Sequence, residues 1–226
     1  SDVCSSDLYC LMFSLQPSDS KRRILGVGDG ASNFNAHATK EGWNVTSLDP
    51  IYQFPSDQIS NRCDAVLDRM MEGVSAIPTH WVWSYFQTPS SLRDYRRQTV
   101  QAFISDLDSD LSGRYVAGAL PELPFRAGAF DLALCSHVLF SWSDLLDLQF
   151  HTNAIEEMLR VAREIRIFPI RNMSLPKPNF VDEVIEIELS KGREVTLQRM
   201  HSQLHSRGTD QLIIRSRTAP DDLLRW

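Results

Sequence analysis

The stretch RILGVGDGAS, residues 23–32, decides the fold, because an apolar run enters a turn that holds Gly26, Gly28 and Gly30. Residues 23–28 predict a first strand. Ser32–Glu41 predicts a helix with Ser32 as its N-cap and Gly42 just beyond its end. Glycine suits the turn because it adopts backbone angles that a Cβ forbids and lets a ligand approach the main chain.

The next strand, NVTSLDP (44–50), ends in an acid. Asp49 lies 19 residues after Gly30, and a carboxylate at that place can accept hydrogen bonds from ribose hydroxyls. The glycine turn, the spaced acid and the strand context together indicate a site for a cofactor that contains a nucleoside.

Apolar runs alternate with helical patterns along the rest of the chain, which is typical of a mainly parallel sheet. One helix is expected where Ile155, Met158, Leu159 and Ala162 recur at helical spacing and so share one face. Another is expected over Asn179–Lys191, ended by Gly192. Further strands are expected at RYVAGA (114–119), FDLALCSHVLF (130–140), EIRIFPI (164–170, ended by Pro169), EVTLQRM (194–200) and QLIIRSR (211–217). The sequence therefore predicts an α/β fold: a doubly wound, mostly parallel sheet of seven strands whose last strands pair antiparallel.

Residues 51–113 form a helical insertion between strands two and three that is too long for one ordinary crossover. Helices are expected over Ile59–Met71 and from Ser91, where Asp94 would complete a capping box. The inner face of the second helix would hold Leu92, Tyr95, Thr99, Phe103 and Leu107. Aromatic residues precede this helix at Trp81, Trp83, Tyr85 and Phe86. The insertion is interpreted as a cap that selects the substrate; the alternative is that its aromatic residues are core.

Composition excludes several classes of protein. The 226 residues carry a net charge of −6, so neither a broad nucleic-acid footprint nor a polybasic membrane anchor is expected. No apolar run reaches the roughly 18 residues of a membrane helix. Cys10, Cys63 and Cys135 lie far apart without metal-ligand spacing, so we expect free thiols in a reducing cytoplasm and no metal site.

Residues 1–8, SDVCSSDL, fit poorly with the apolar run after them. They can be back-translated as TCAGACGTGTGCTCTTCCGATCT, which resembles a sequencing adapter, so we interpret them as an artefact. A single domain is then expected over 9–226. The apolar run Tyr9–Leu15 is interpreted as a short helix or arm that lies on this domain.

These features resemble class I S-adenosylmethionine-dependent methyltransferases of the bacterial methyltransferase-domain type, which have a Rossmann-like fold. The resemblance rests on ILGVGDGAS (24–32), VTSLDP (45–50), LPELPFRAGAFDLALCSHVLF (120–140) and EEMLRVAREIRIFPI (156–170). Its most specific part joins Leu123–Phe125 to Phe130 and Asp131 through a short spacer.

The resemblance implies S-adenosyl-L-methionine as cofactor and a place for each site residue. The turn around Gly28 would wrap the methionine moiety, Asp49 would hold the ribose, and Ile51 and Leu120 would sandwich the adenine. Ser136 and His137 would face the transferable methyl group. The implied cofactor-binding residues are Gly26, Val27, Gly28, Gly30, Asp49, Pro50, Ile51, Leu120 and Ser136.

Three positions depart from the family pattern. The family usually has an acid where Gly26 stands, and Asp29 is the acid nearby in sequence. Ser32 replaces the third glycine of the loop, and Ala119 replaces an acid after strand three. A cofactor-binding protein without catalysis therefore stays an alternative, as does an NAD(P)-dependent oxidoreductase, since Gly26-x-Gly28-x-x-Ala31 also fits a dinucleotide fingerprint.

His137 is the candidate general base, because the pKa range of histidine suits proton removal near neutral pH. His80 and His151 are weaker candidates. The expected reaction is in-line methyl transfer to an unidentified acceptor, and a small molecule fits better than nucleic acid. Basic clusters at KRR (21–23) and RDYRR (93–97) could mark an anionic acceptor.

Overall fold

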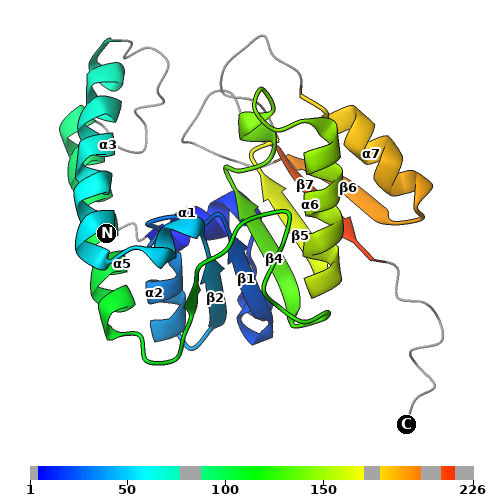
Figure 1. Cartoon of the computed structure of the whole chain (residues 1–226), viewed down its shortest axis with the longest axis horizontal. Helices are drawn as coiled ribbons and strands as arrows, with labels where there is room; N and C mark the ends of the chain where they lie inside the picture. Colours follow the sequence, from blue (N-terminus) through cyan, green and yellow to red (C-terminus); the bar gives the residue numbers. More distant parts are fainter. Residues whose placement is uncertain (1–4, 77–87, 171–178, 200–209, 217–226) are drawn as a thin grey trace.

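The computed structural model describes residues 5–76, 88–170, 179–199 and 210–216. Within them, one sheet has the strand order β3-β2-β1-β4-β5-β7-β6 (Figure 1). Its strands are β1 (Arg23–Val27), β2 (Asn44–Leu48), β3 (Tyr115–Val116), β4 (Phe130–Ser136), β5 (Ala162–Phe168), β6 (Glu194–Arg199) and β7 (Asp210–Arg215). The α-helices are α1 (Ser5–Phe13), α2 (Phe34–Lys40), α3 (Ser56–Ala76), α5 (Pro89–Ser109), α6 (Leu148–Val161) and α7 (Val181–Ser190). Short 3-10 helices are η1 (Pro17–Lys21), η2 (Pro50–Gln53) and η4 (Phe140–Trp142).

The predicted fold class is confirmed. Strand β1 pairs parallel with β2 and β4, and β2–β3 and β4–β5 are parallel as well. Strand β7 pairs antiparallel with β5 and with β6. The sheet is thus mostly parallel with antiparallel last strands.

Two strands are shorter than predicted. Strand β3 holds only Tyr115–Val116, because the chain then bends into an isolated bridge between Ala119 and Glu122. Strand β4 ends at Ser136 because His137 takes a left-handed φ of 55° and turns the chain away from the sheet.

Two helix starts also differ from the prediction. Helix α2 begins at Phe34, and the Oγ of Ser32 accepts a hydrogen bond from the Phe34 N–H at 3.1 Å without being the N-cap. Helix α5 is capped by Thr88, with Pro89 in its first turn. The capping box joins Thr88 to Ser91, so the predicted pair of Ser91 and Asp94 is wrong.

The helix ends agree with the glycine signals. Gly42 and Gly192, with φ of 83° and 75°, come just after α2 and α7. A left-handed residue at this place ends a helix without the steric cost of a Cβ. On α5, Leu92, Thr99 and Phe103 are buried, whereas Tyr95 and Leu107 are only half-buried.

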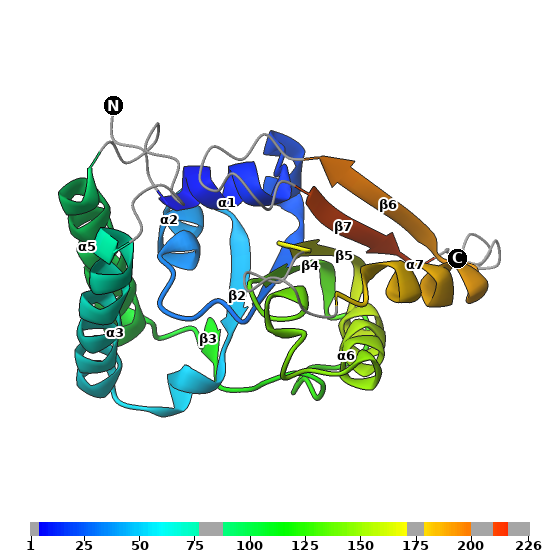
Figure 2. The same ribbon diagram turned by 90° about the horizontal axis from the view of Figure 1, so that it is seen from above.

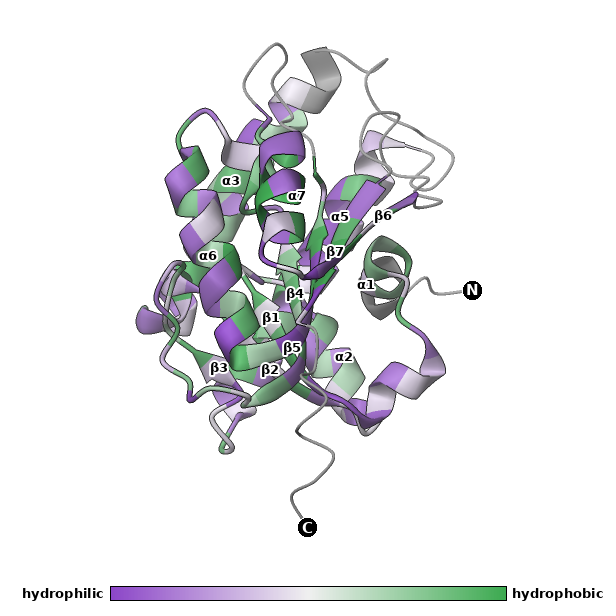
Figure 3. Ribbon diagram, turned by 90° about the vertical axis from the view of Figure 1, so that its right-hand side faces the viewer, coloured by the Kyte–Doolittle hydropathy of each residue, from purple (hydrophilic) through white to green (hydrophobic). Residues whose placement is uncertain are grey.

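Helices cover both faces of the sheet in three layers. Helices α1 and α2 lie on one face and α6 and α7 on the other, while α3 and α5 pack together beyond the β3 edge (Figures 2 and 3). Side chains of β4 alternate between the two cores: Leu132 and Leu134 join the α1 side, and Ala133 and Cys135 join the α6 side. None of the described helices has the length and apolar character needed to cross a bilayer.

The N-terminal arm packs on the sheet as expected. Tyr9, Met12, Phe13 and Leu15 are buried beside β1 and α2. Among the described residues, Cys10 on this arm, Cys63 and Cys135 are not joined in disulfides. Residues 1–4 lie outside the described part, so the artefact hypothesis for residues 1–8 stays a prediction.

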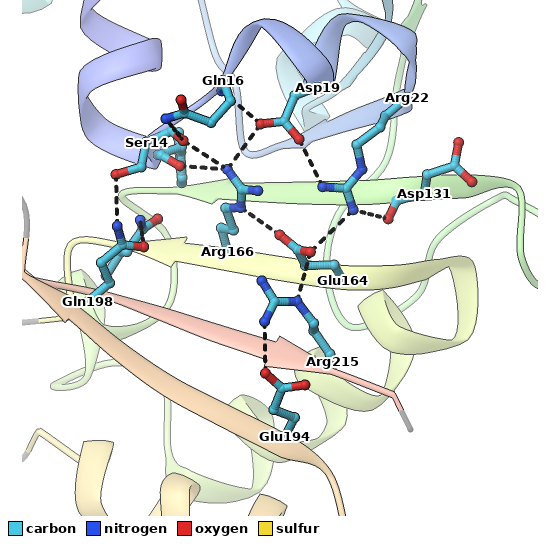
Figure 4. Close-up of polar contacts among 12 residues, drawn as sticks. Ser14, Gln16, Asp19, Arg22, Asp131, Glu164, Arg166, Glu194, Gln198 and Arg215 are labelled. Atoms are coloured by element: carbon cyan, nitrogen blue, oxygen red, sulfur yellow. Dashed lines mark hydrogen bonds and ion pairs between the residues drawn. The ribbon is translucent and has the colours of Figure 1, made fainter. Parts of the chain in front are cut away.

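Buried charges fasten this arm to β5 (Figure 4). Arg166, 8% exposed, donates to the Phe13 carbonyl at 2.8 Å and pairs with Glu164 at 2.7 Å. Glu164 also pairs with Arg22 at 3.3 Å and Arg215 at 2.9 Å. The network therefore joins the segment before β1 to β5 and β7.

Candidate active site

The sheet changes its winding direction between β1 and β4. The connection through α2 leads from β1 to β2 on one side, and the connection through α6 leads from β4 to β5 on the other. The loops that leave β1 and β4 therefore diverge, which is where ligands bind in open α/β sheets. A cavity of about 460 Å³ lies there, and Gly28, Asp29, Ser136 and His137 line it.

Three helices build the other walls of this cavity. Helix α1 contributes Tyr9 and Met12, and the insertion contributes side chains of α3 and α5. The residues from the insertion are Arg62, Cys63, Asp64, Val66, Leu67, Met70, Tyr95, Arg96, Arg97, Thr99 and Val100. The insertion thus supplies a wall, while the aromatic residues predicted for a cap, Trp81, Trp83, Tyr85 and Phe86, lie outside the described residues, as does His80.

Gly28 and Gly30 both have left-handed backbones, with φ of 70° and 54°. Their surroundings differ. A Cβ on Gly28 would lie 2.1 Å from Cγ2 of Val138, whereas a Cβ on Gly30 would meet only Oδ2 of Asp49, at 3.9 Å. The fold itself therefore needs glycine at 28, and the surface beside Gly30 is open to a ligand.

Gly28→Ala should destabilise the protein more than Gly30→Ala. Both variants place a Cβ on a left-handed backbone, at a cost of about 1–2 kcal/mol. Only the first also overpacks against Val138, which adds roughly 1–3 kcal/mol. Urea unfolding measures both, and equal losses would show that the contact with Val138 relaxes freely.

The carboxyl group of Asp29 lies where a side chain at position 26 would stand. A Cβ built on Gly26 would be 1.9 Å from Oδ2 of Asp29. Ser47 donates to this oxygen at 2.5 Å, and the hydroxyl of Tyr9 donates to Oδ1 at 3.0 Å. The acid missing at 26 is therefore replaced in space by an acid three residues further on.

Burial makes Asp29 costly to ionise. The side chain is 6% exposed, and burial, with a smaller contribution from Asp49, raises its pKa to about 6, although the hydrogen bonds from Ser47 and Tyr9 oppose the shift. A buried carboxylate that lines a cavity is suited to bind a cationic group.

Asp49 links the end of β2 to the glycine loop. Its two oxygens accept hydrogen bonds from the backbone N–H groups of Gly30 and Ile51, each at 2.9 Å. Burial raises its pKa, and the two N–H groups oppose that shift. Tyr52 donates to the Gly30 carbonyl at 2.7 Å and fixes the loop from the other side.

The predicted cofactor residues fall into separate groups. Gly28 and Ser136 line the cavity with His137, whereas Gly30, Asp49 and Ile51 are joined by hydrogen bonds at the end of β2, with exposed Pro50 between the last two. Val27 is 1% exposed and packs in the core, so its side chain is no part of the site. Leu120 packs, half-buried, against the same core and does not line the cavity.

His137 is held in place at the end of β4. Its backbone N–H donates to the Phe168 carbonyl at 2.8 Å, and its carbonyl accepts from Nε1 of Trp142 at 3.1 Å. Nδ1 of the ring lies 2.9 Å from Oγ of Ser136. A left-handed backbone at a non-glycine residue is uncommon and gathers at functional sites.

His151 lies elsewhere. It is fully buried between the rings of Phe140 and Phe180, and its Nδ1 is 2.7 Å from the Asp147 carbonyl. Burial lowers its pKa. It does not line the cavity, so the structure does not bring it to the candidate site.

The sequence patterns do not reveal the cavity residues of α1 and α3. Tyr9 belongs to the predicted arm, and Arg62 carries no motif. The helical spacing of Arg62, Val66 and Met70 is the signal that could have shown that they share a face. Within the described ranges, no group of His, Cys, Asp or Glu side chains could hold a metal ion.

No model of a known protein family matches the chain. The Uncharacterized protein MJ0045 of Methanocaldococcus jannaschii is 31% identical over 208 residues, which are 92% of this chain and 91% of that protein. The chain belongs to the family of this archaeal protein. The relative is archaeal, so it gives no support to a bacterial type.

Solved structures share the fold. Magnesium protoporphyrin IX methyltransferase (ChlM) of Synechocystis PCC 6803, crystallised with bound SAM, has a TM-score of 0.50 at 9% identity, covering 94% of this chain and 78% of that one. Monomeric WbdD has a TM-score of 0.52 at 12% identity, covering 95% of this chain and 42% of that one. The sheet is thus the methyltransferase form of the Rossmann-like fold.

Proposed function

We propose that this protein is an S-adenosylmethionine-dependent methyltransferase that acts on a small molecule. The observation that carries the proposal is the cavity at the switch point, lined by the glycine loop of β1 and by Ser136 and His137 of β4. The shared fold and the sequence resemblance support it. Cytoplasmic location is part of the proposal.

The residues present fit the cofactor. The surface at Gly30 leaves room for a ligand beside the main chain, and Asp49 next to it keeps lone pairs for ribose hydroxyls. Asp29 would bind the cationic amino group, which gives its costly charge a partner. Ile51 and Leu120 would contact the adenine.

When bound, the cofactor supplies a methyl group on a sulfonium that is already activated. The chain's own residues would orient the acceptor in line with that methyl and exclude water. His137 would remove a proton from the acceptor where its chemistry needs it, through Nε2, while Ser136 holds Nδ1.

Asp49→Ala should weaken binding of S-adenosylhomocysteine by roughly 2–3 kcal/mol, because hydrogen bonds to a charged group are lost. Isothermal titration calorimetry measures this affinity. A parallel titration with NAD tests the oxidoreductase alternative. The control is Asp57→Ala, an exposed acid in the first turn of α3. Unchanged affinity in Asp49→Ala would remove this residue from the site.

A further inference from the structure

Three arginines from two helices face one cavity. Arg62 comes from α3, and Arg96 and Arg97 come from α5, which packs against α3. Both helices stand opposite the loops that hold Asp29 and His137, so the cavity combines a cationic wall with a floor that carries one buried acid.

These arginines lack carboxylate partners within the described ranges. Arg93, earlier on α5, pairs with Asp68, and Arg22 and Arg23 pair with acids around the start of β1. No ion pair is formed by Arg62, Arg96 or Arg97 among the residues that the structure describes, and Asp64 is the only acid of the insertion on the cavity wall.

The basic clusters of the sequence are therefore separated by the fold. In KRR (21–23), Arg22 and Arg23 form ion pairs with acids near β1, whereas RDYRR (93–97) divides between a surface ion pair and the cavity. The Arg96 residue is exposed overall. Protein atoms near its guanidinium group nevertheless desolvate that group and lower its pKa. It remains charged at neutral pH because arginine starts from a pKa above 12.

The cavity lining around the arginines also contains apolar side chains, beside the polar side chains of Asp64, Tyr95 and Thr99. Side chains that carry no charge and no hydrogen-bonding group fill the space around the arginines: Met12, Val66, Leu67, Met70 and Val100. A ligand that matches this lining has an apolar body and an anionic end.

We propose that the methyl acceptor is such an organic anion, whose carboxylate or phosphate group binds Arg62, Arg96 and Arg97. The inference rests on the proposed function and names the substrate class of the same site. Guanidinium groups suit carboxylate and phosphate because their N–H donors match the geometry of paired oxygens. Binding of the anionic end to α3 and α5 leaves the other end of the acceptor free to face His137.

The test uses protein loaded with S-adenosylhomocysteine and probes that differ in charge. Benzoate and phenyl phosphate are titrated calorimetrically beside neutral benzamide and phenol. We expect at least one anion to bind at least about tenfold more tightly than its neutral counterpart, and this preference to shrink as salt screens the charges. Equal affinities of anions and neutral probes would overturn the proposal.

Variants locate the anion site. Arg62→Gln and Arg96→Gln should each weaken the preferred anion about tenfold, and Arg96→Lys should recover part of the loss. The control is Arg126→Ala: this exposed arginine precedes β4, at the end opposite Ser136. Loss of affinity in the control, or none in the cavity variants, would contradict the assignment.

The affinity for S-adenosylhomocysteine distinguishes failure of the acceptor proposal from failure of the proposed function. Affinity for S-adenosylhomocysteine should stay within about twofold in the arginine variants, as expected for groups that do not touch it. If the variants lose that affinity instead, the arginines bind the cofactor carboxylate and the acceptor proposal is wrong. If no form binds S-adenosylhomocysteine, the proposed function fails, while anion preference in the unloaded protein still reports on the arginines.

Discussion

Asp29→Asn should gain stability relative to the wild type as pH rises from about 4 to 7, and it should weaken the binding of S-adenosylhomocysteine. The native carboxyl has a pKa of about 6, against 3.8 for an ordinary aspartate. The folded state therefore holds its proton more tightly than the unfolded chain, so stability falls as pH rises from about 4 to 6 and stays lower above that. The difference of roughly two pKa units corresponds to about 3 kcal/mol.

The variant lacks this titration. Its stability relative to the wild type should rise by up to about 3 kcal/mol between pH 4 and pH 7, whatever the asparagine does to the bonds with Ser47 and Tyr9. Chemical unfolding across that pH range measures the difference. A difference independent of pH would show that Asp29 titrates normally.

Cofactor affinity should change in the opposite direction. Loss of a charge-assisted contact to the amino group should weaken S-adenosylhomocysteine by roughly 1.5–3 kcal/mol at pH 7.5. Because a bound cation favours the carboxylate, the wild type should also release protons on binding below about pH 6.5, and the variant should not. Calorimetry in buffers of different ionisation enthalpy detects this proton release. Equal proton release in both proteins would show that Asp29 does not contact the ligand.

Glu164→Gln should cause the largest loss of stability, about 3–5 kcal/mol. Burial by itself would raise the pKa of Glu164, but Arg215, Arg166 and Arg22 outweigh it and lower the pKa to about 2 from 4.5. The native charge is therefore favoured, and its contribution is present above about pH 4.5 and is lost as pH falls toward 2. The glutamine leaves Arg166 buried without its carboxylate.

Glu194→Gln is the matched control. Glu194 pairs with the same Arg215 at 2.9 Å, but its side chain is 59% exposed. Loss of an exposed ion pair costs about 0–1 kcal/mol. Urea unfolding at pH 7 compares the two variants, and equal losses would show that burial of the network adds nothing.

The sequence by itself determined the order of strands and helices and the fold class. Apolar runs such as β1 and β4 are clear because strands of a parallel sheet are buried on both faces. Glycine and proline signals are confirmed as well: Gly42 and Gly192 end helices, and β5 stops before Pro169. These signals are local, since each depends on the backbone of one or two residues.

Only the tertiary structure decided which side chains meet. The replacement of an acid at 26 by Asp29 depends on a backbone turn that no spacing rule describes. Two of the ion pairs of Glu164, with Arg22 and Arg215, join residues far apart in the chain. The division of the RDYRR cluster depends on how α5 is rotated against α3. Local patterns therefore determined the elements, and packing between elements determined the charges that the cavity presents, because side-chain contacts at long sequence separation leave no local signal.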